Sequence, residues 1–214
     1  PQLGYWRIRG LSAGIVYQLK YQGVEFEMVE YEQGDGPEYS RAAWYDVKPT
    51  LGHSFPNLPY FVDGDFNMSE TFAIHKYIAD KWHPELLGTT ALQRAQVNML
   101  SGVLKDVKEA ITDLATLKAK DVVADAAKAQ LPKIVEWLGD KQFLTESVTW
   151  LDFYFWEMLE LARSCYPELY VDFPTLGAYH ENVANLPRLK EYLEDPNHRE
   201  ANRTFNNKHA QVKI

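Results

Sequence analysis

The hydrophobic positions of the first 82 residues follow two different periods. Segment 2–6 is short and apolar and runs into Arg-Ile-Arg-Gly, which predicts a strand followed by a turn. Within 11–22 the apolar side chains have helical spacing, which predicts a helix. Segment 23–31 then alternates apolar and acidic side chains, as in a strand with one solvated face. The chain therefore begins with a predicted strand–helix–strand unit.

A long connection separates this unit from a hairpin and a second helix. Residues 32–54 have turn residues at both ends and little periodicity, but an adjacent tryptophan and tyrosine argue against plain disorder. An apolar strand follows, then an Asp-Gly turn at 63–64, a short return strand and a helix over 71–82. This order predicts a four-stranded mixed sheet with helices, which is a thioredoxin-like pattern.

The second half of the chain has only helical periods. Residues 83–90 form a linker rich in turn signals, and 118–139 has helical spacing. Thr149 and Asp152 have the spacing of a capping box ahead of a helix that is apolar nearly all round, which predicts the buried centre of an all-helical domain. One apolar face is predicted to continue along the helix before it, at Leu92, Met99, Val103, Val107, Ile111 and Leu114. The predicted organisation is a domain over 1–82, a linker over 83–90 and an all-α domain over 91–214.

Composition limits the function classes. The 214 residues have a formal net charge of −8, so a nucleic acid or an anionic membrane is not an expected partner. Residues 196–214 are locally basic and are interpreted as a solvated tail. The single cysteine, Cys165, excludes an intrachain disulfide and a CxxC pair, which favours a reducing compartment, with the cytoplasm as the default. The six histidines have no metal-ligand spacing, no run of 18 apolar residues occurs, and neither a metal site nor a membrane span is expected.

Four segments in the right order carry a family resemblance: "GYWRIRGL", "GDGPEYSRAAW", "LGHSFPNLPY" and "SET" before a helix. Together they resemble cytosolic glutathione transferases, and the insertion at 32–48 resembles the extra loop of the mu class. The resemblance implies a thioredoxin-like domain that binds glutathione, an all-α domain with an electrophile pocket, and a homodimer. Glutathione would be a co-substrate, and no further cofactor is expected.

Tyr5 matches the family's catalytic tyrosine. A free thiol has a pKa of about 8.5, so little of it is thiolate at neutral pH. One charge-assisted hydrogen bond contributes roughly 1.5–3 kcal/mol, and one pKa unit corresponds to about 1.36 kcal/mol. A well-placed hydroxyl can therefore lower the thiol pKa by roughly one to two units. From the pattern alone, a half-buried strand aromatic with its hydroxyl in water is the favoured interpretation of Tyr5, and the family resemblance reverses it.

The resemblance also implies a set of residues that hold the tripeptide. Asn57, Leu58 and Pro59 would present a backbone edge through a cis Leu58–Pro59 bond, where a trans bond in an ordinary turn is the alternative. Glu70 and Thr71 open a helix whose free N–H groups suit a carboxylate. Glu70 departs from the glutamine usual in the mu class, and a plain N-cap by Ser69 or Thr71 is the alternative reading.

Further residues of the loop and of the first turn complete the implied site. Arg41, Trp44 and Lys48 match residues that hold the glycyl carboxylate, whereas surface solubility is the ordinary fate of the two cations. Trp6 and Leu11 would line the site, with core packing as the alternative.

The second domain and the dimer supply the last implied residues. Asp106 matches an aspartate that reaches the ligand of the neighbouring subunit, and Phe55 matches an aromatic key between subunits; a solvated helix residue and a buried core residue are the alternatives. The electrophile pocket would include Ile8, Lys105 and Thr116, where Lys105 replaces a usual methionine and Thr116 a usual tyrosine.

The predicted function is therefore conjugation of the glutathione thiolate to small hydrophobic electrophiles. A glutathione-dependent isomerase or peroxidase would use the same site. A non-catalytic ligand carrier or structural protein on the same fold is the alternative from another class.

Overall fold

The computed structural model describes residues 1–117 and 120–208, without the side chains of 112–117. The first half forms one sheet from the strands β1 (Gln2–Trp6), β2 (Glu27–Tyr31), β3 (Tyr60–Asp63) and β4 (Phe66–Ser69). The strand order is β2-β1-β3-β4, with β1 parallel to β2 and the other two pairs antiparallel. The predicted four-stranded mixed sheet is confirmed.

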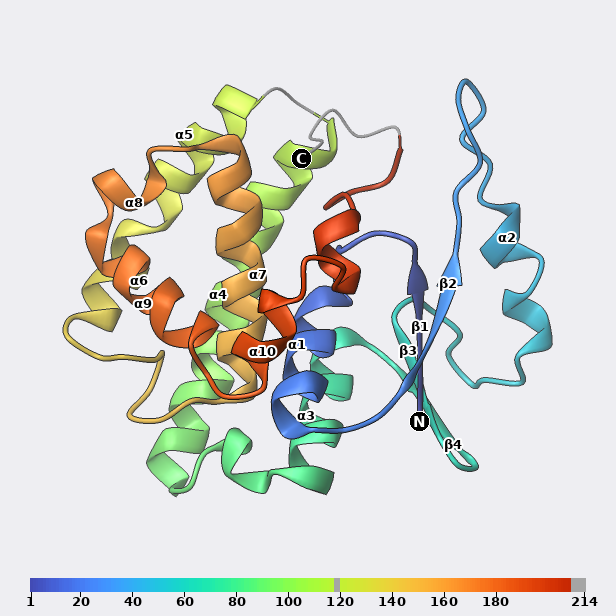
Figure 1. Ribbon diagram of the computed structural model, residues 1–214, viewed down its shortest axis with the longest axis horizontal. Coiled ribbons are helices and arrows are strands. Elements are labelled where there is room, and N and C mark those ends of the chain that lie inside the picture. The colour runs from blue at the N-terminus through green and yellow to red at the C-terminus, as the bar shows by residue number, and fades with distance from the viewer. Residues whose placement is uncertain (118–119, 209–214) are drawn as a thin grey trace.

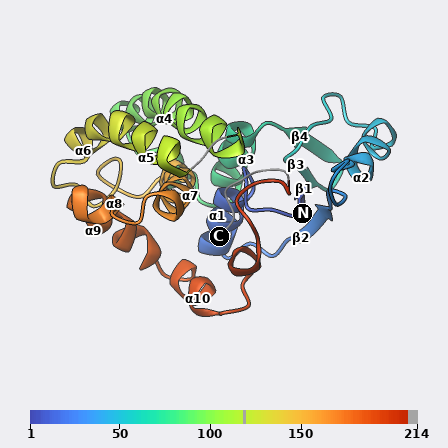
Figure 2. The same ribbon diagram turned by 90° about the horizontal axis from the view of Figure 1, so that it is seen from above.

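Helices cover both faces of this sheet, as Figures 1 and 2 show. On one face lie α1 (Ala13–Gln22) and α3 (Thr71–Trp82), which bury an aliphatic core against β1 and β3. On the other face lie the short α2 (Ala42–Tyr45) and the 3₁₀ helix η1 (Lys48–Thr50). The connection over 32–54 is therefore largely ordered by packing, as its aromatic residues indicated.

The second strand begins later than its sequence pattern suggests. Gly23 ends α1 with φ at 68°, a left-handed conformation that glycine adopts without a steric penalty. The N–H of Val24 still bonds the carbonyl of Leu19 at 3.0 Å, so the chain remains tied to the helix there. Ladder pairing starts only at Glu27, where β1 lies alongside.

The second half is helical, and no strand follows β4 among the described residues. The elements are η2 (Pro84–Leu87), α4 (Ala91–Leu117), α5 (Lys120–Gln130), α6 (Pro132–Leu138), α7 (Trp150–Cys165), α8 (Leu169–Asp172), α9 (Pro174–Ala184), α10 (Leu189–Glu194) and η3 (Arg199–Asn202). Helix α7 runs through the centre of this half (Figure 1) and is buried almost all round. Its predicted capping box is present: the N–H of Thr149 donates to Asp152 at 2.7 Å.

The apolar face predicted along α4 is wrong over its first half. Val107 and Ile111 are buried, but the earlier positions point outward, and Val97, Leu100 and Leu104 pack into the core instead. The exposed fractions are 70% for Leu92, 52% for Met99 and 42% for Val103. The helix therefore has a buried stripe and, in its N-terminal half, a separate exposed apolar stripe.

The solvated basic tail is a second correction. Residues 199–208 pack along the first domain, next to the turn that follows β1 and the end of β2 (Figure 1). Glu200 and Phe205 are buried. The basic residues of this segment face acidic partners on and beyond β2, so their charges are paired rather than solvated.

Candidate functional site

Tyr5 lies near the end of β1, with its hydroxyl inside the protein. Its side chain is only 6% exposed, and its hydroxyl oxygen accepts a hydrogen bond from the N–H of Leu11 at 3.0 Å. Burial raises the pKa of Tyr5 to about 12, although the Leu11 hydrogen bond and the charge of Arg199 act in the opposite direction. The hydroxyl thus stays protonated at neutral pH and can still donate its own proton. A half-buried aromatic with its hydroxyl in water does not describe this residue.

The turn after β1 is shaped to bring Leu11 to that hydroxyl. Gly10 has φ at 45°, and a Cβ built on it would lie 2.7 Å from the Tyr5 hydroxyl oxygen. Real side chains do not tolerate so short a contact, so glycine is required by both conformation and space. The turn after β1 therefore packs closely against the phenol, and this packing requires glycine at position 10.

The basic residues of the long connection lie together around one exposed ring. Arg41 precedes α2 and Lys48 opens η1, and their charged groups lie 5.8 Å and 5.9 Å from the centre of the Tyr45 ring. Trp44 points the other way, is 3% exposed, and stacks on Tyr60 with ring centres 6.1 Å apart. Trp44 thus anchors α2 to the sheet, and the two cations are held near each other at the surface.

The start of α3 has an unusual backbone and no side-chain cap. Glu70 has φ at 76°, and its side chain is exposed and does not cap the helix. Such a conformation costs a non-glycine residue about 1–3 kcal/mol. The Ser69 hydroxyl donates to the carbonyl of Phe55 at 2.7 Å, so it does not cap either. The first N–H groups of α3, beginning at Thr71, are therefore left for another acceptor.

The segment before β3 has the predicted cis Leu58–Pro59 bond, and a second cis bond, Gly36–Pro37, was not predicted. The N–H of Leu58 donates to the side-chain oxygen of Asn57 at 2.9 Å. In this structure, the backbone donor that was expected to face a peptide ligand is thus occupied by its own neighbour.

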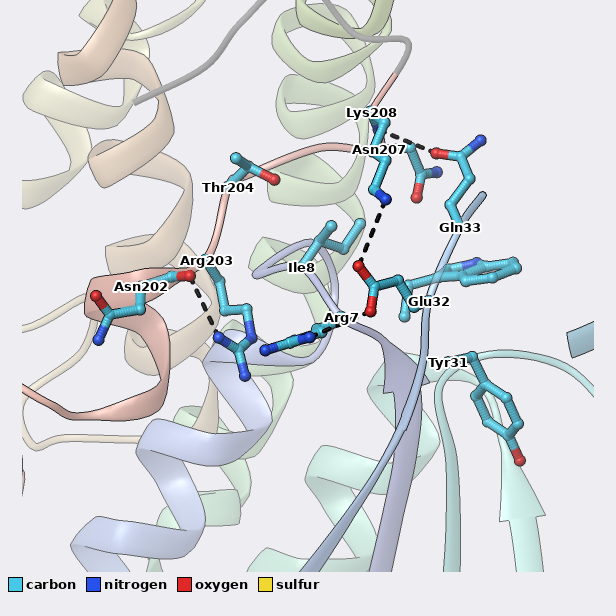
Figure 3. A pocket seen from close by; sticks show the side chains of 11 residues that line it. Arg7, Ile8, Tyr31, Glu32, Gln33, Asn202, Arg203, Thr204, Asn207 and Lys208 are labelled. Carbon is cyan, nitrogen blue, oxygen red and sulfur yellow. Dashed lines mark hydrogen bonds and ion pairs between the residues drawn. The ribbon is translucent and has the colours of Figure 1, made fainter. Parts of the chain in front are cut away.

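A cavity of about 240 Å³ lies between the turn after β1, the end of β2 and the C-terminal segment (Figure 3). Trp6 and Ile8 contribute to its wall together with charged residues of the turn after β1, of the segment after β2 and of the tail. Its lining residues are Trp6, Arg7, Ile8, Tyr31, Glu32, Gln33, Asn202, Arg203, Thr204, Asn207 and Lys208. A second cavity, of about 430 Å³, lies beside Glu70 and Phe55.

The other predicted residues are not brought to the first cavity. Lys105 lies on α4 with an exposed side chain that pairs with Glu109 at 3.7 Å. Asp106 is exposed on the same helix. The side chain of Thr116 lies outside the part of the chain that the structure describes. Phe55 is 83% exposed and so is not the core residue that the alternative reading required.

Sequence reasoning missed the contribution of the C-terminal segment. Thr204 and Phe205 accept hydrogen bonds from the backbone of Arg9 and Gly10, in the turn beside Tyr5. Three acidic residues on and after β2, Glu30, Glu32 and Asp35, form ion pairs with basic residues of this segment. Nothing in the sequence indicated that the acidic and the basic residues would meet.

Among the described residues, both a cluster of metal-ligating side chains and a membrane-spanning helix are absent. No group of three histidine, cysteine, aspartate or glutamate side chains there could hold a metal ion. Likewise, none of the described helices combines the length and the apolar character that crossing a membrane requires.

The fold and the site define a class: a thioredoxin-like domain joined to a helical domain, with a buried tyrosine hydroxyl in the first turn. Residues 1–80 match the model for the glutathione S-transferase N-terminal domain, and residues 102–196 match a model for its C-terminal domain. The chain belongs to the glutathione S-transferase family.

Individual relatives agree with this assignment. The chain is 34% identical to a class-mu 26 kDa glutathione S-transferase isozyme of Fasciola hepatica, covering 90% of this chain and 88% of the relative. It is 32% identical to glutathione S-transferase Mu 4 of Mus musculus, covering 90% and 89%. The crystal structure of the glutathione S-transferase Blo t 8 superposes over all of both chains with a TM-score of 0.87 at 25% identity. The protein is thus a member of an enzyme family, and its relatives include glutathione S-transferases of the mu class.

Proposed function

We propose that this transferase forms the thiolate of bound glutathione with the help of the Tyr5 hydroxyl and adds it to a small hydrophobic electrophile. The observation that carries the proposal is the Leu11 hydrogen bond to the Tyr5 oxygen, which leaves the phenol proton free for another acceptor. Because burial keeps the pKa of Tyr5 high, the phenol remains a donor over the physiological range. The thiol proton passes to solvent, because the protonated phenol cannot accept it. The sulfur then attacks the electrophilic carbon, a C–S bond forms, and the leaving group departs with its electron pair.

The tripeptide is held by groups with complementary charge. We infer that Arg41 and Lys48, whose charged groups lie 5.8 Å and 5.9 Å from the centre of the Tyr45 ring, bind the glycyl carboxylate of glutathione. The uncapped start of α3 at Thr71 suits the carboxylate of the γ-glutamyl end. Glu70, exposed at the same helix start, would bind the ammonium group.

The cysteinyl part of glutathione would contact the segment before β3. Its backbone would pair with that of Leu58 after the Asn57 side chain turns away. Trp6 and Leu11 would form the wall nearest the sulfur.

The chain functions as a homodimer in this proposal. The exposed Phe55 and the exposed apolar stripe of α4 would both be covered by a second copy. Asp106, which lies on that helix, would reach the ligand of the partner copy. We expect light scattering at micromolar concentration to give a mass of twice 24.7 kDa, and Phe55→Ser to lower it towards one chain. A wild-type monomer at that concentration would remove both roles.

The electrophile would enter beside Trp6 and Ile8. The charged wall of the cavity there, and the exposed position of Lys105, leave the preferred electrophile open. We also propose the cytoplasm as the compartment, since the chain has one cysteine and needs glutathione in reduced form.

The test is conjugation of an aryl halide by wild type and by Tyr5→Phe. We expect the rate of the variant to fall at least tenfold at pH 6.5, because roughly 1.5–3 kcal/mol of thiolate stabilisation is lost. Glutathione binding should be retained, because the cations and the helix start are unchanged. An equal rate in both proteins would sink the mechanism. A wild type that binds glutathione but conjugates nothing would instead favour the ligand carrier.

A further inference from the structure

We propose that Arg199, in the C-terminal segment, is a positioning residue for Tyr5: it holds the turn that keeps the N–H of Leu11 on the phenol oxygen. This inference rests on the proposed function of Tyr5 and extends it to a residue that lies 194 positions away in the sequence and donates its hydrogen bonds to the turn rather than to the phenol.

Arg199 reaches three parts of the molecule with one planar side chain. Its Nη2 donates to the carbonyl of Ile8 at 2.9 Å and lies 3.5 Å from the carbonyl of Trp6. Its Nε donates to Glu30 at 2.9 Å and its Nη1 to Glu200 at 2.7 Å. The side chain is only 12% exposed. A guanidinium has donors fixed in a fork, so these contacts specify where residues 6–8 lie relative to β2.

The C-terminal segment also binds the backbone of the next two residues of the turn, Arg9 and Gly10. The N–H of Arg9 donates to Thr204 at 2.8 Å, and the N–H of Gly10 donates to Phe205 at 3.0 Å. The Arg9 guanidinium also lies 4.1 Å from the centre of the Phe205 ring. Every residue from Ile8 to Gly10 is thus bonded to the C-terminal segment, and the following residue is Leu11. The donor to Tyr5 is therefore fixed by a segment from the other end of the chain.

Arg199 acts mainly by holding the turn in position, although its charge also lowers the pKa of Tyr5. Its charge faces Glu30 of β2 and the buried Glu200, so two carboxylates balance it. Arg203 shares Glu30 with it, and Tyr192 and His198 contact Glu200. A lysine would keep the charge but has no fork to join the two carboxylates to a carbonyl. Arg199→Lys should therefore behave more like a loss of the residue than like wild type.

Arg203 offers a matched control. It pairs with the same Glu30 at 2.9 Å and belongs to the same segment, but its remaining side-chain hydrogen bond goes to the carbonyl of Asn202 and not to the turn beside Tyr5. Because Arg203 also lines the first cavity, it is compared by the thiol pKa of the binary complex alone and not by turnover. The experiment compares Arg199→Met, Arg199→Lys and Arg203→Met by the ultraviolet absorbance of the glutathione thiolate as a function of pH in the binary complex.

We expect Arg199→Met to raise the pKa of the bound thiol by about half to one unit, which corresponds to a three- to tenfold loss of thiolate well below that pKa. The value of kcat/KM at pH 6.5 should fall by a similar factor and recover above the new pKa, while the affinity for glutathione changes less than about twofold. Arg199→Lys should show at least half of that pKa shift, and Arg203→Met should leave the thiol pKa unchanged.

A thiol pKa in Arg199→Met equal to that of wild type would overturn the inference. So would an equal shift in Arg203→Met, because that would indicate general loosening of the segment. If Arg199→Met does not fold because Glu200 is left buried, the pair Arg199→Met with Glu200→Gln replaces it, and the same outcomes apply. A wild type without any thiolate absorbance would refute the proposed function itself, whereas a normal wild type with an unaffected variant would refute only the role of Arg199.

Discussion

The interface between the two domains and the surface of the first domain use polar residues in opposite ways. At the interface, Arg9 and Glu157 form a buried pair at 2.6 Å, with Tyr17 bonded to both. On the surface, Arg41 and Lys48 lie against the Tyr45 ring, and neither has a carboxylate partner within the described part of the chain. The first group is satisfied within the chain and holds the domains together. In the proposed function, the second group binds a ligand.

Substitutions at the interface should therefore change the free energy of unfolding, whereas substitutions at the surface should change ligand binding. A buried pair contributes little net stability when intact, but removing one partner leaves an uncompensated charge. An exposed cation contributes little to stability in any case.

The largest effect is expected for Glu157→Gln. The change leaves the Arg9 charge buried with only Glu160, 3.7 Å away, as a carboxylate partner. We expect a loss of roughly 3–5 kcal/mol in the free energy of unfolding, measured by urea denaturation. Glu109→Gln, which breaks the exposed pair with Lys105, should cost less than about 1 kcal/mol. Equal losses in the two variants would contradict this difference between the interface and the surface.

A smaller effect of opposite sign is expected for Lys108→Met. Lys108 is 7% exposed with its ammonium group 4.6 Å from the centre of the Tyr154 ring, and burial lowers its pKa to about 8 despite the nearby Glu157. The folded state therefore disfavours the charged form. Between the folded pKa of about 8 and the ordinary lysine pKa of 10.5, the unfolded chain binds more protons, so the stability of wild type rises with pH over that window.

Lys108→Met should thus stabilise the protein by up to about 3 kcal/mol at pH 7, because about 1.36 kcal/mol accompanies each unit of the shift. The gain should shrink as pH rises towards 10.5. Lys105→Met, three residues earlier on the exposed face, should change the unfolding free energy little at either pH. A destabilised Lys108→Met at pH 7 would show that the ammonium group stabilises the interface after all.

Substitutions of Arg41 and Lys48 should change the affinity for glutathione and leave the free energy of unfolding almost unchanged. We expect Arg41→Ala with Lys48→Ala to weaken glutathione binding at least tenfold in calorimetry, since charge-assisted hydrogen bonds contribute roughly 1.5–3 kcal/mol. The unfolding free energy should change by less than about 0.5 kcal/mol. Lys133→Ala, another exposed cation, should affect neither quantity. Unchanged glutathione affinity in the double variant would remove these two residues from the site.

The sequence predicted the parts whose signals are local. The sheet, the helix over 71–82 and the capping box of α7 all depend on periods or spacings within a few residues, and all are confirmed. The cis bond before Pro59 is also present, although only the family resemblance indicated it. Tyr5 could be singled out because it lies inside a recognisable segment.

The packing of the C-terminal segment and the choice of the buried face of α4 depend on contacts between residues far apart in the sequence. Arg199 meets Glu30 across 169 residues, and a basic segment near the end of a chain has the same composition whether it is solvated or packed. The apolar positions of α4 similarly have helical spacing on two faces, and which face is buried depends on where α7 lies. Tertiary packing decides both, so neither was predictable from a window of sequence.

The central claim is that the Tyr5 hydroxyl, held by Leu11, stabilises the glutathione thiolate. The most direct test is the pH titration of thiolate absorbance in the binary complex of wild type and of Tyr5→Phe. We predict that wild type lowers the thiol pKa from about 8.5 by roughly one to two units, and that Tyr5→Phe returns most of that shift with glutathione still bound. A thiol pKa that is the same in both proteins would contradict the account.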